Sequence, residues 1–153
     1  MRILKLSLPV LLAGALLGGC DQVSAPAPNT QGDAAFVTKL TQLCKSTPAL
    51  VVLAPLRTPS AIIKAAQTNQ KTLWNLQIAV TSITPMLSNA TPLAPAITQG
   101  DSLILDASNL YGDVARGVMT KNRHLVRGAA GRAHQRLDEA QAELRQIGIT
   151  DCP

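Results

Sequence analysis

The chain has 153 residues, a length that fits one domain with a single hydrophobic core. It carries 14 Lys and Arg against 9 Asp and Glu, and this modest positive balance does not indicate nucleic acid as a partner. Because there is one Phe, one Trp and one Tyr, any core must be built from Leu, Ile, Val and Ala.

The first 21 residues have the pattern of an export signal. Arg2 and Lys5 form a short positive segment, and the stretch 6–17 is apolar apart from Ser7 and Pro9. This order of charge and apolar length is typical of a secretory signal. A bilayer span needs about 20 apolar residues, so the run is too short for a comfortable transmembrane helix.

The signal ends in Leu17-Gly18-Gly19-Cys20, which resembles the lipobox of bacterial lipoproteins. The resemblance implies that the Cys20 thiol receives a diacylglycerol, that the chain is cut just before it, and that the freed amine is acylated. Two or more fatty chains hold a protein stably at a membrane, whereas one holds it marginally. The alternative is an ordinary signal peptide cut near Ala13 to Ala15, which leaves Cys20 as a plain thiol.

Asp21 resembles the residue that keeps lipoproteins of enteric bacteria at the inner membrane. We therefore expect the periplasmic side of the inner membrane, with the outer membrane as the alternative. The segment 22–32, QVSAPAPNTQG, is polar and contains two prolines, so it is predicted to act as a tether. The expected organisation is a lipoprotein signal peptide over 1–19, a lipidated flexible tether over 20–32 and a helical periplasmic domain over 33–153.

If the lipid takes Cys20, the two remaining cysteines are Cys44 and Cys152, in a compartment that permits disulfides. We predict that they pair with each other. In the chain-entropy model, closing a loop of about 107 residues stabilises a protein by roughly 4 to 5 kcal/mol. The alternative is two reduced thiols with no relation to each other.

The folded part is predicted to begin with a helix from Ala34 to about Lys45, capped by Asp33 and ended by Pro48. The next segment, 49–56, reads ALVVLAPL and is apolar, but no second strand pattern exists to pair with it. We expect an extended crossing packed on the helices. A patch that touches the membrane is the alternative.

A long helix is predicted to start at Thr58 and Pro59, because Pro at the first helical position sacrifices no bonded amide. Pro85 should end it at Thr84. Trp74 is interpreted as packing at the edge of this helix. The helix carries a coiled-coil-like stripe that could pack within the chain or between chains. Its one polar member, Asn69, is of the kind that fixes pairing register. The stripe consists of Ile62, Ala66, Asn69, Leu73, Leu76, Val80, Ile83 and Leu87.

The proline-containing segment 88–100 is predicted to form a turn, and Thr98 with Asp101 resembles a capping box at the start of the next helix. An apolar pattern over 103–147 then indicates one long helix, or two end to end with a break near 121–122. Glycines cost about 1 kcal/mol each inside a helix relative to Ala, so those in this region mark either close helix contacts or the break: Gly112, Gly117, Gly128 and Gly131. Gly148 is expected to stop the last helix.

Between Asp113 and Asp138 the chain has no acid and six cations, Arg116, Lys121, Arg123, Arg127, Arg132 and Arg136. On one continuous helix, Arg116, Arg123 and Arg127 share one side. Lys121, Arg132 and Arg136 lie nearly opposite. The cations would then flank the apolar face. They are interpreted either as a solvated helix surface or as a binding face for anionic lipid headgroups, cell-wall polymer or an acidic partner protein.

No pattern in the sequence indicates catalysis. His124 and His134 are ten residues apart, on different faces of one helix, and neither has a Cys or carboxylate at ligand spacing, so no metal site is expected. Motifs for serine hydrolases, zinc proteases, phosphate loops and dinucleotide binding do not occur. We therefore predict no cofactor and no enzymatic activity.

Together these observations predict an all-α fold, a small up-and-down bundle of about three main helices with no sheet, closed by Cys44 and Cys152. The expected function is that of a membrane-anchored, non-enzymatic interaction or structural module of the cell envelope, whose partner is an envelope protein and not nucleic acid. The alternative is an immunity or inhibitor protein that neutralises a toxin or hydrolase in the periplasm, where tethering raises its effective concentration.

Overall fold

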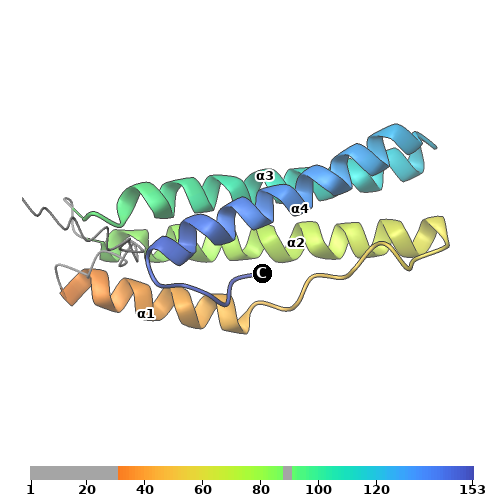
Figure 1. Cartoon of the computed structure of the whole chain (residues 1–153). Helices are drawn as coiled ribbons and strands as arrows, with labels where there is room; N and C mark the ends of the chain where they lie inside the picture. The colour runs from red at the N-terminus through yellow and green to blue at the C-terminus, as the bar shows by residue number, and fades with distance from the viewer. Residues whose placement is uncertain (1–30, 88–90) are drawn as a thin grey trace, which may run out of the picture.

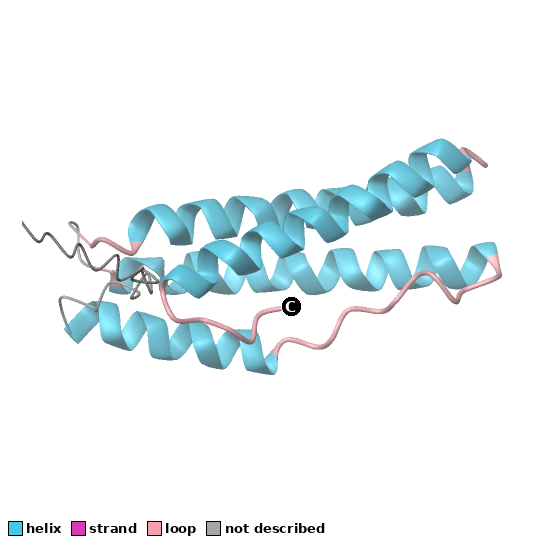
Figure 2. Cartoon of the chain, in the orientation of Figure 1, coloured by secondary structure: helices cyan, strands magenta, loops and turns pink. Residues whose placement is uncertain are grey.

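The computed structural model describes residues 31–87 and 91–153. This part of the chain contains four α-helices and one short 3-10 turn, and no strand (Figure 2). The helices lie side by side in an up-and-down arrangement, with α1 and α3 running one way and α2 and α4 the other (Figure 1). Three of them have 24 to 26 residues and α1 has 16. The predicted all-helical bundle is confirmed.

α1 (Gln31–Ser46) begins three residues earlier than expected. Asp33 therefore lies in the first turn of the helix, fully buried, and is not the residue that precedes it. An acidic side chain suits this place, because the first turn leaves backbone N–H groups unpaired at the positive end of the helix dipole. Phe36, Leu40 and Cys44 face the core from the inner side of the helix.

The segment that follows α1 crosses the bundle in an extended form and covers the half of α2 that α1 does not reach (Figure 1). Leu50 and Leu53 are half-buried against the core. Asn69 of α2 holds this segment through both backbone groups of Val51, since its Oδ1 accepts from the Val51 N–H at 2.8 Å and its Nδ2 donates to the Val51 carbonyl at 3.0 Å. The predicted extended crossing is confirmed. Asn69 does not fix a register between helices, but joins the crossing to α2.

α2 (Pro59–Ile83) starts and stops where the sequence predicts. The Thr58 hydroxyl accepts a hydrogen bond from the Ala61 N–H at 3.3 Å, and Pro85 lies in a 3-10 turn, η1 (Thr84–Met86), directly after the helix. The central six members of the predicted stripe are buried, and Ile62 and Leu87 at its ends are half-buried. The stripe therefore packs within the chain.

α3 (Ala94–Met119) starts well before the predicted capping box, so the expectation of a turn up to Gly100 was wrong. Pro95 lies in the first turn of the helix, where its missing N–H costs no hydrogen bond, and it therefore starts the helix and does not interrupt it. Thr98 and Asp101 are inside α3 and cap nothing. The seam with α2 is tight: a Cβ on Gly112 would lie 2.8 Å from Nε2 of Gln70.

The chain reverses between α3 and α4 (Arg123–Gln146), so the two helices form an antiparallel hairpin and are not placed end to end (Figure 1). Lys121 has a φ of 56°, and the Asn122 N–H donates to the Gly117 carbonyl at 2.8 Å. This bond closes the end of α3 in the manner of a Schellman motif. The Asn122 side chain then caps α4 by accepting from the Leu125 N–H at 3.0 Å.

The core has two parts. The larger one gathers the inner faces of all four helices, including Phe36, Leu73 and Tyr111. The smaller one lies towards the α3–α4 turn and consists mostly of small residues, which allow the helices to approach closely: Ala66, Val114, Ala115 and Ala129.

The C-terminal tail returns along α1 after Gly148, whose φ of 84° ends α4 as predicted (Figure 1). Ile149 is buried, and Cys152 forms a disulfide with Cys44, with a Cα to Cα distance of 4.5 Å. The predicted pairing is confirmed. The disulfide joins the last residues of the chain to the first helix of the bundle.

Candidate functional site: the basic end of the hairpin

Cys20, the predicted site of lipidation, and Asp21, the predicted sorting residue, lie outside the described residues. Both assignments stay predictions. Within the described part, no helix is long and apolar enough to span a bilayer.

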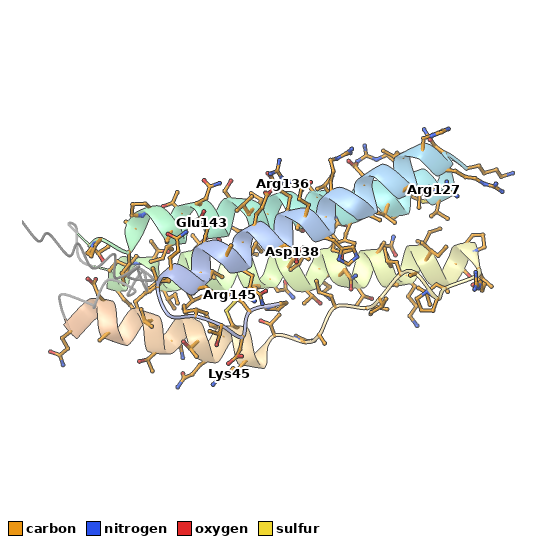
Figure 3. The ribbon with its side chains drawn as sticks, viewed as in Figure 1. Lys45, Arg127, Arg136, Asp138, Glu143 and Arg145 are labelled. Carbon is orange, nitrogen blue, oxygen red and sulfur yellow. A yellow bond between two sulfur atoms is a disulfide. The ribbon has the colours of Figure 1, made fainter. Side chains whose placement is uncertain are left out.

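The predicted basic face is divided by the reversal at Lys121. The expectation that its six cations flank one continuous apolar face was wrong, because it assumed that α3 and α4 follow each other along one axis. Lys121, Arg123 and Arg127 instead gather where the hairpin turns. Arg127 lies near that end of α4, and Arg136 lies near the middle of the helix (Figure 3). Arg116, in the last turn of α3, is paired with Asp113 at 3.3 Å.

The cations along the middle of α4 are next to acids. Arg136 donates from Nη1 to Oε2 of Glu139 at 2.6 Å, and its Nε is 3.9 Å from Oδ2 of Asp106. The hydrogen bond from Arg136 lowers the pKa of Glu139, and the same bond raises the pKa of Arg136. Arg132 lines a shallow pocket together with Asp106 and Asp113. These neighbouring acids weaken the attraction of this stretch for an anionic ligand.

The three cations at the turn have no such neighbours. Lys121, Arg123 and Arg127 are exposed, and none of them has an ion-pair partner in the part of the chain that the structure describes. The first turn of α4 contains no acidic residue that could pair with them. The turn is therefore the site at which positive charge is concentrated and unpaired. We call it the hairpin end, defined by residues 117–127.

A groove of about 440 Å³ opens at the hairpin end, between the start of α2, the end of α3 and the start of α4. Met119, the last residue of α3 and the next in sequence after the lining residue Val118, is 61% exposed. The groove has apolar walls with cations among them, and its lining residues are Pro59, Ile62, Gly117, Val118, Lys121, Arg123, Val126 and Arg127. The sequence alone could not reveal this groove, because α2 contributes to it from about 60 positions earlier in the chain.

A second groove, of about 750 Å³, lies where α2, η1 and α3 meet, and among the described residues Asp101 is the one charged residue that lines it. The Asp101 Oδ1 is buried without a hydrogen-bond partner, and its Oδ2 accepts from Nε2 of Gln77 at 3.3 Å. Burial raises the pKa of this carboxyl, and the hydrogen bond from Gln77 offsets part of the rise. The other lining residues are threonines and apolar residues, so a single carboxyl has no second acid or base to work with here.

Potential metal ligands do not converge in the described residues, where no group of three His, Cys, Asp or Glu side chains could hold an ion. His124 and His134 are both exposed on α4. Comparisons of the chain with protein-family models, with curated proteins and with solved structures find no match. The functional argument therefore depends on the residues themselves.

Proposed function

We propose that the protein is a bacterial lipoprotein, anchored through acyl chains on Cys20, that acts without catalysis as an interaction module of the cell envelope. The lipobox-like ending of its first 20 residues supports the anchor. The observation that carries the interaction role is the hairpin end, where three unpaired cations surround an apolar groove. Unpaired charges next to an exposed apolar surface are typical of a site that contacts a partner.

The positions of the N-terminal helix and of the hairpin end support the proposed interaction role. α1 starts at one end of the molecule and the hairpin turn lies at the other (Figure 1). α3 has 26 residues, and at 1.5 Å per residue it is about 39 Å long. A chain anchored through its N-terminus can therefore present the hairpin end at a distance from its own attachment point.

The anchor is tested by growing cells with an alkyne-tagged fatty acid and measuring label on the purified protein. We expect label on the wild type and none on Cys20→Ser. The matched control is the double variant C20S/Q22C, which restores a thiol two positions further on and should also remain unlabelled, because the modification depends on the position of the cysteine after Gly19. Label on Cys20→Ser, or none on the wild type, contradicts the anchor. Sucrose-gradient separation of the two membranes tests the inner-membrane assignment from Asp21.

Neutralisation of a periplasmic toxin or hydrolase is the second candidate. The unpaired cations of the hairpin end favour it to the extent that the target is an acidic protein. Proteins of this kind are commonly encoded beside their targets, so a neighbouring gene for an exported toxin or hydrolase would support it. Binding of that product by the wild type, and not by a variant without these cations, would establish it.

A further inference from the structure

We propose that the partner of the hairpin end is an anionic lipid surface, with Met119 entering the headgroup layer and the cations Lys121, Arg123 and Arg127 contacting lipid phosphates. This inference deepens the proposed function. It depends on that function for the anchor, but the chemistry of the hairpin end stands on its own residues. The first argument is the sign of the charge, since a planar anionic surface attracts cations and repels any acid close to it.

The composition of the groove favours lipid over an acidic protein. In the part of the chain that the structure describes, its lining consists of apolar residues, one glycine and three cations, with no neutral hydrogen-bonding side chain. Protein interfaces carry about one hydrogen bond per 100–200 Å² and a polar rim of mixed character. A bilayer surface has a plane of phosphates above hydrocarbon, which matches cations placed around apolar side chains.

The exposure of Met119 favours lipid over cell-wall polymer. This side chain is 61% exposed at the very end of α3, and the half-buried Val118 and Val126 line the groove at the same end of the bundle. A polar polysaccharide gains nothing from an exposed methionine. Inserting an apolar side chain below the headgroups removes it from water, and this gain adds to the electrostatic attraction.

The same end of the bundle has further cationic character from a distant part of the chain. α2 starts here (Figure 1), and Arg57, an exposed residue, precedes its capping residue Thr58. No acid lies between Asp113 and Asp138, which spans the whole turn. The positive field therefore extends across the end of the molecule and is not confined to one helix.

The experiment places an environment-sensitive fluorophore at the hairpin end of the intact lipoprotein. With Cys20 acylated and Cys44 bonded to Cys152, the variant Met119→Cys has a single reactive thiol. The labelled protein is anchored in vesicles of phosphatidylcholine, and vesicles of equal parts phosphatidylcholine and phosphatidylglycerol are added. We expect a blue shift of the emission with the anionic vesicles, a loss of the shift at high salt, and no shift with phosphatidylcholine alone.

Charge variants test which residues bind. The double variant R123Q/R127Q should raise the lipid concentration at half-maximal shift by about 25-fold, since each cation near an anionic surface contributes roughly fivefold. The matched control, K39Q/K71Q, removes the same charge from two exposed positions away from the hairpin end, and should change this concentration by less than about threefold. Gln has nearly the same helix propensity as Arg and Lys, so both variants should fold.

Three results would overturn the inference: no shift with anionic vesicles, an equal shift with phosphatidylcholine alone, or equal losses in the two double variants. A response to isolated cell-wall polymer or to an acidic polypeptide, without a response to anionic vesicles, would assign the groove to that partner. If the protein fails to float with its phosphatidylcholine vesicles, the anchor is wrong. The labelled protein is then added directly to anionic vesicles, where the same shift and the same charge variants still test the hairpin end.

Discussion

Replacing both bridged cysteines, C44A/C152A, should remove a large share of the free energy of unfolding. The disulfide joins residues 108 positions apart, and the chain-entropy model assigns a closure of that length about 4.8 kcal/mol at room temperature. Domains of this size are stable by about 5 to 15 kcal/mol in total. The bridge therefore accounts for a large share of the free energy of unfolding.

The other contacts of the tail replace little of this loss. Lys45 and Asp151 form an ion pair of 3.7 Å between exposed side chains, which contributes little, and Gln141 donates to the Cys152 carbonyl at 3.3 Å. Ile149 is buried and should remain so, since its position follows from the end of α4. We therefore expect a helical variant that is destabilised by about 3 to 5 kcal/mol.

The measurement is equilibrium unfolding in urea, followed by far-ultraviolet circular dichroism, on the oxidised wild type and on C44A/C152A. Reduced wild type is the matched control, because it has open thiols without a change of sequence, and it should fall close to the variant. A loss of less than about 1 kcal/mol in both would contradict the reasoning, since it would mean that closing the loop does not constrain the unfolded chain.

Gly131→Ala should stabilise the protein by roughly 0.5 to 1 kcal/mol, because a Cβ there meets no atom within 4 Å. Gly117→Ala should destabilise it by about 1 to 2 kcal/mol, because its Cβ would lie 2.9 Å from a side chain of α4. Urea midpoints of the two variants that move in the same direction would refute this pair of predictions. Asn69→Ala should cost about 1 to 3 kcal/mol and speed hydrogen exchange at the Val51 amide, while unchanged exchange there would show that the Asn69 bonds do not hold the crossing. For Asp101, burial raises the folded pKa above its ordinary value of 3.8, so ionisation costs stability as the pH rises through the folded pKa. The free energy of unfolding of Asp101→Asn minus that of the wild type should therefore be larger at neutral pH than well below 3.8, and a difference that does not change with pH would contradict the assignment.

The elements that the sequence predicts correctly are those whose signals are local. α2 is bounded by Thr58 with Pro59 and by Pro85, and its apolar spacing alone identifies the buried face. The disulfide follows from counting cysteines. In each case a few neighbouring residues or one compositional fact decide the structure.

The elements that the sequence does not predict depend on contacts between distant segments. The break near 121–122 is one of the two alternatives that the sequence offers, but the reversal of the chain there is not predicted. Lys121 has a φ of 56°, where glycine is the usual residue, so no glycine marks the reversal. Pro95 was interpreted as part of a turn because a proline in the first turn of a helix and a proline in a loop look alike in the sequence. The partner of Asn69 is 18 residues away and carries no motif of its own.

The candidate site also has a part that the sequence predicts and a part that only the fold determines. The sequence identifies a run of six cations without an acid. The structure shows which three gather at the turn without an ion pair, while Arg116 and Arg136 are paired and Arg132 shares a pocket with two acids. Arg136 is paired with Glu139 and Asp106, and Asp106 comes from the neighbouring helix at a distance in sequence that no spacing rule connects. The apolar groove beside the hairpin end requires the start of α2, so it exists only in the folded chain.

The most direct test of an anchored interaction module is the intact mass of the protein extracted from bacterial envelopes without reducing agent. We expect a chain that begins at Cys20, with the mass of a diacylglycerol and of an additional acyl group, and with the two hydrogens of the Cys44 and Cys152 thiols missing. A chain that begins near Ala13 to Ala15 and has no acyl mass would contradict the central claim.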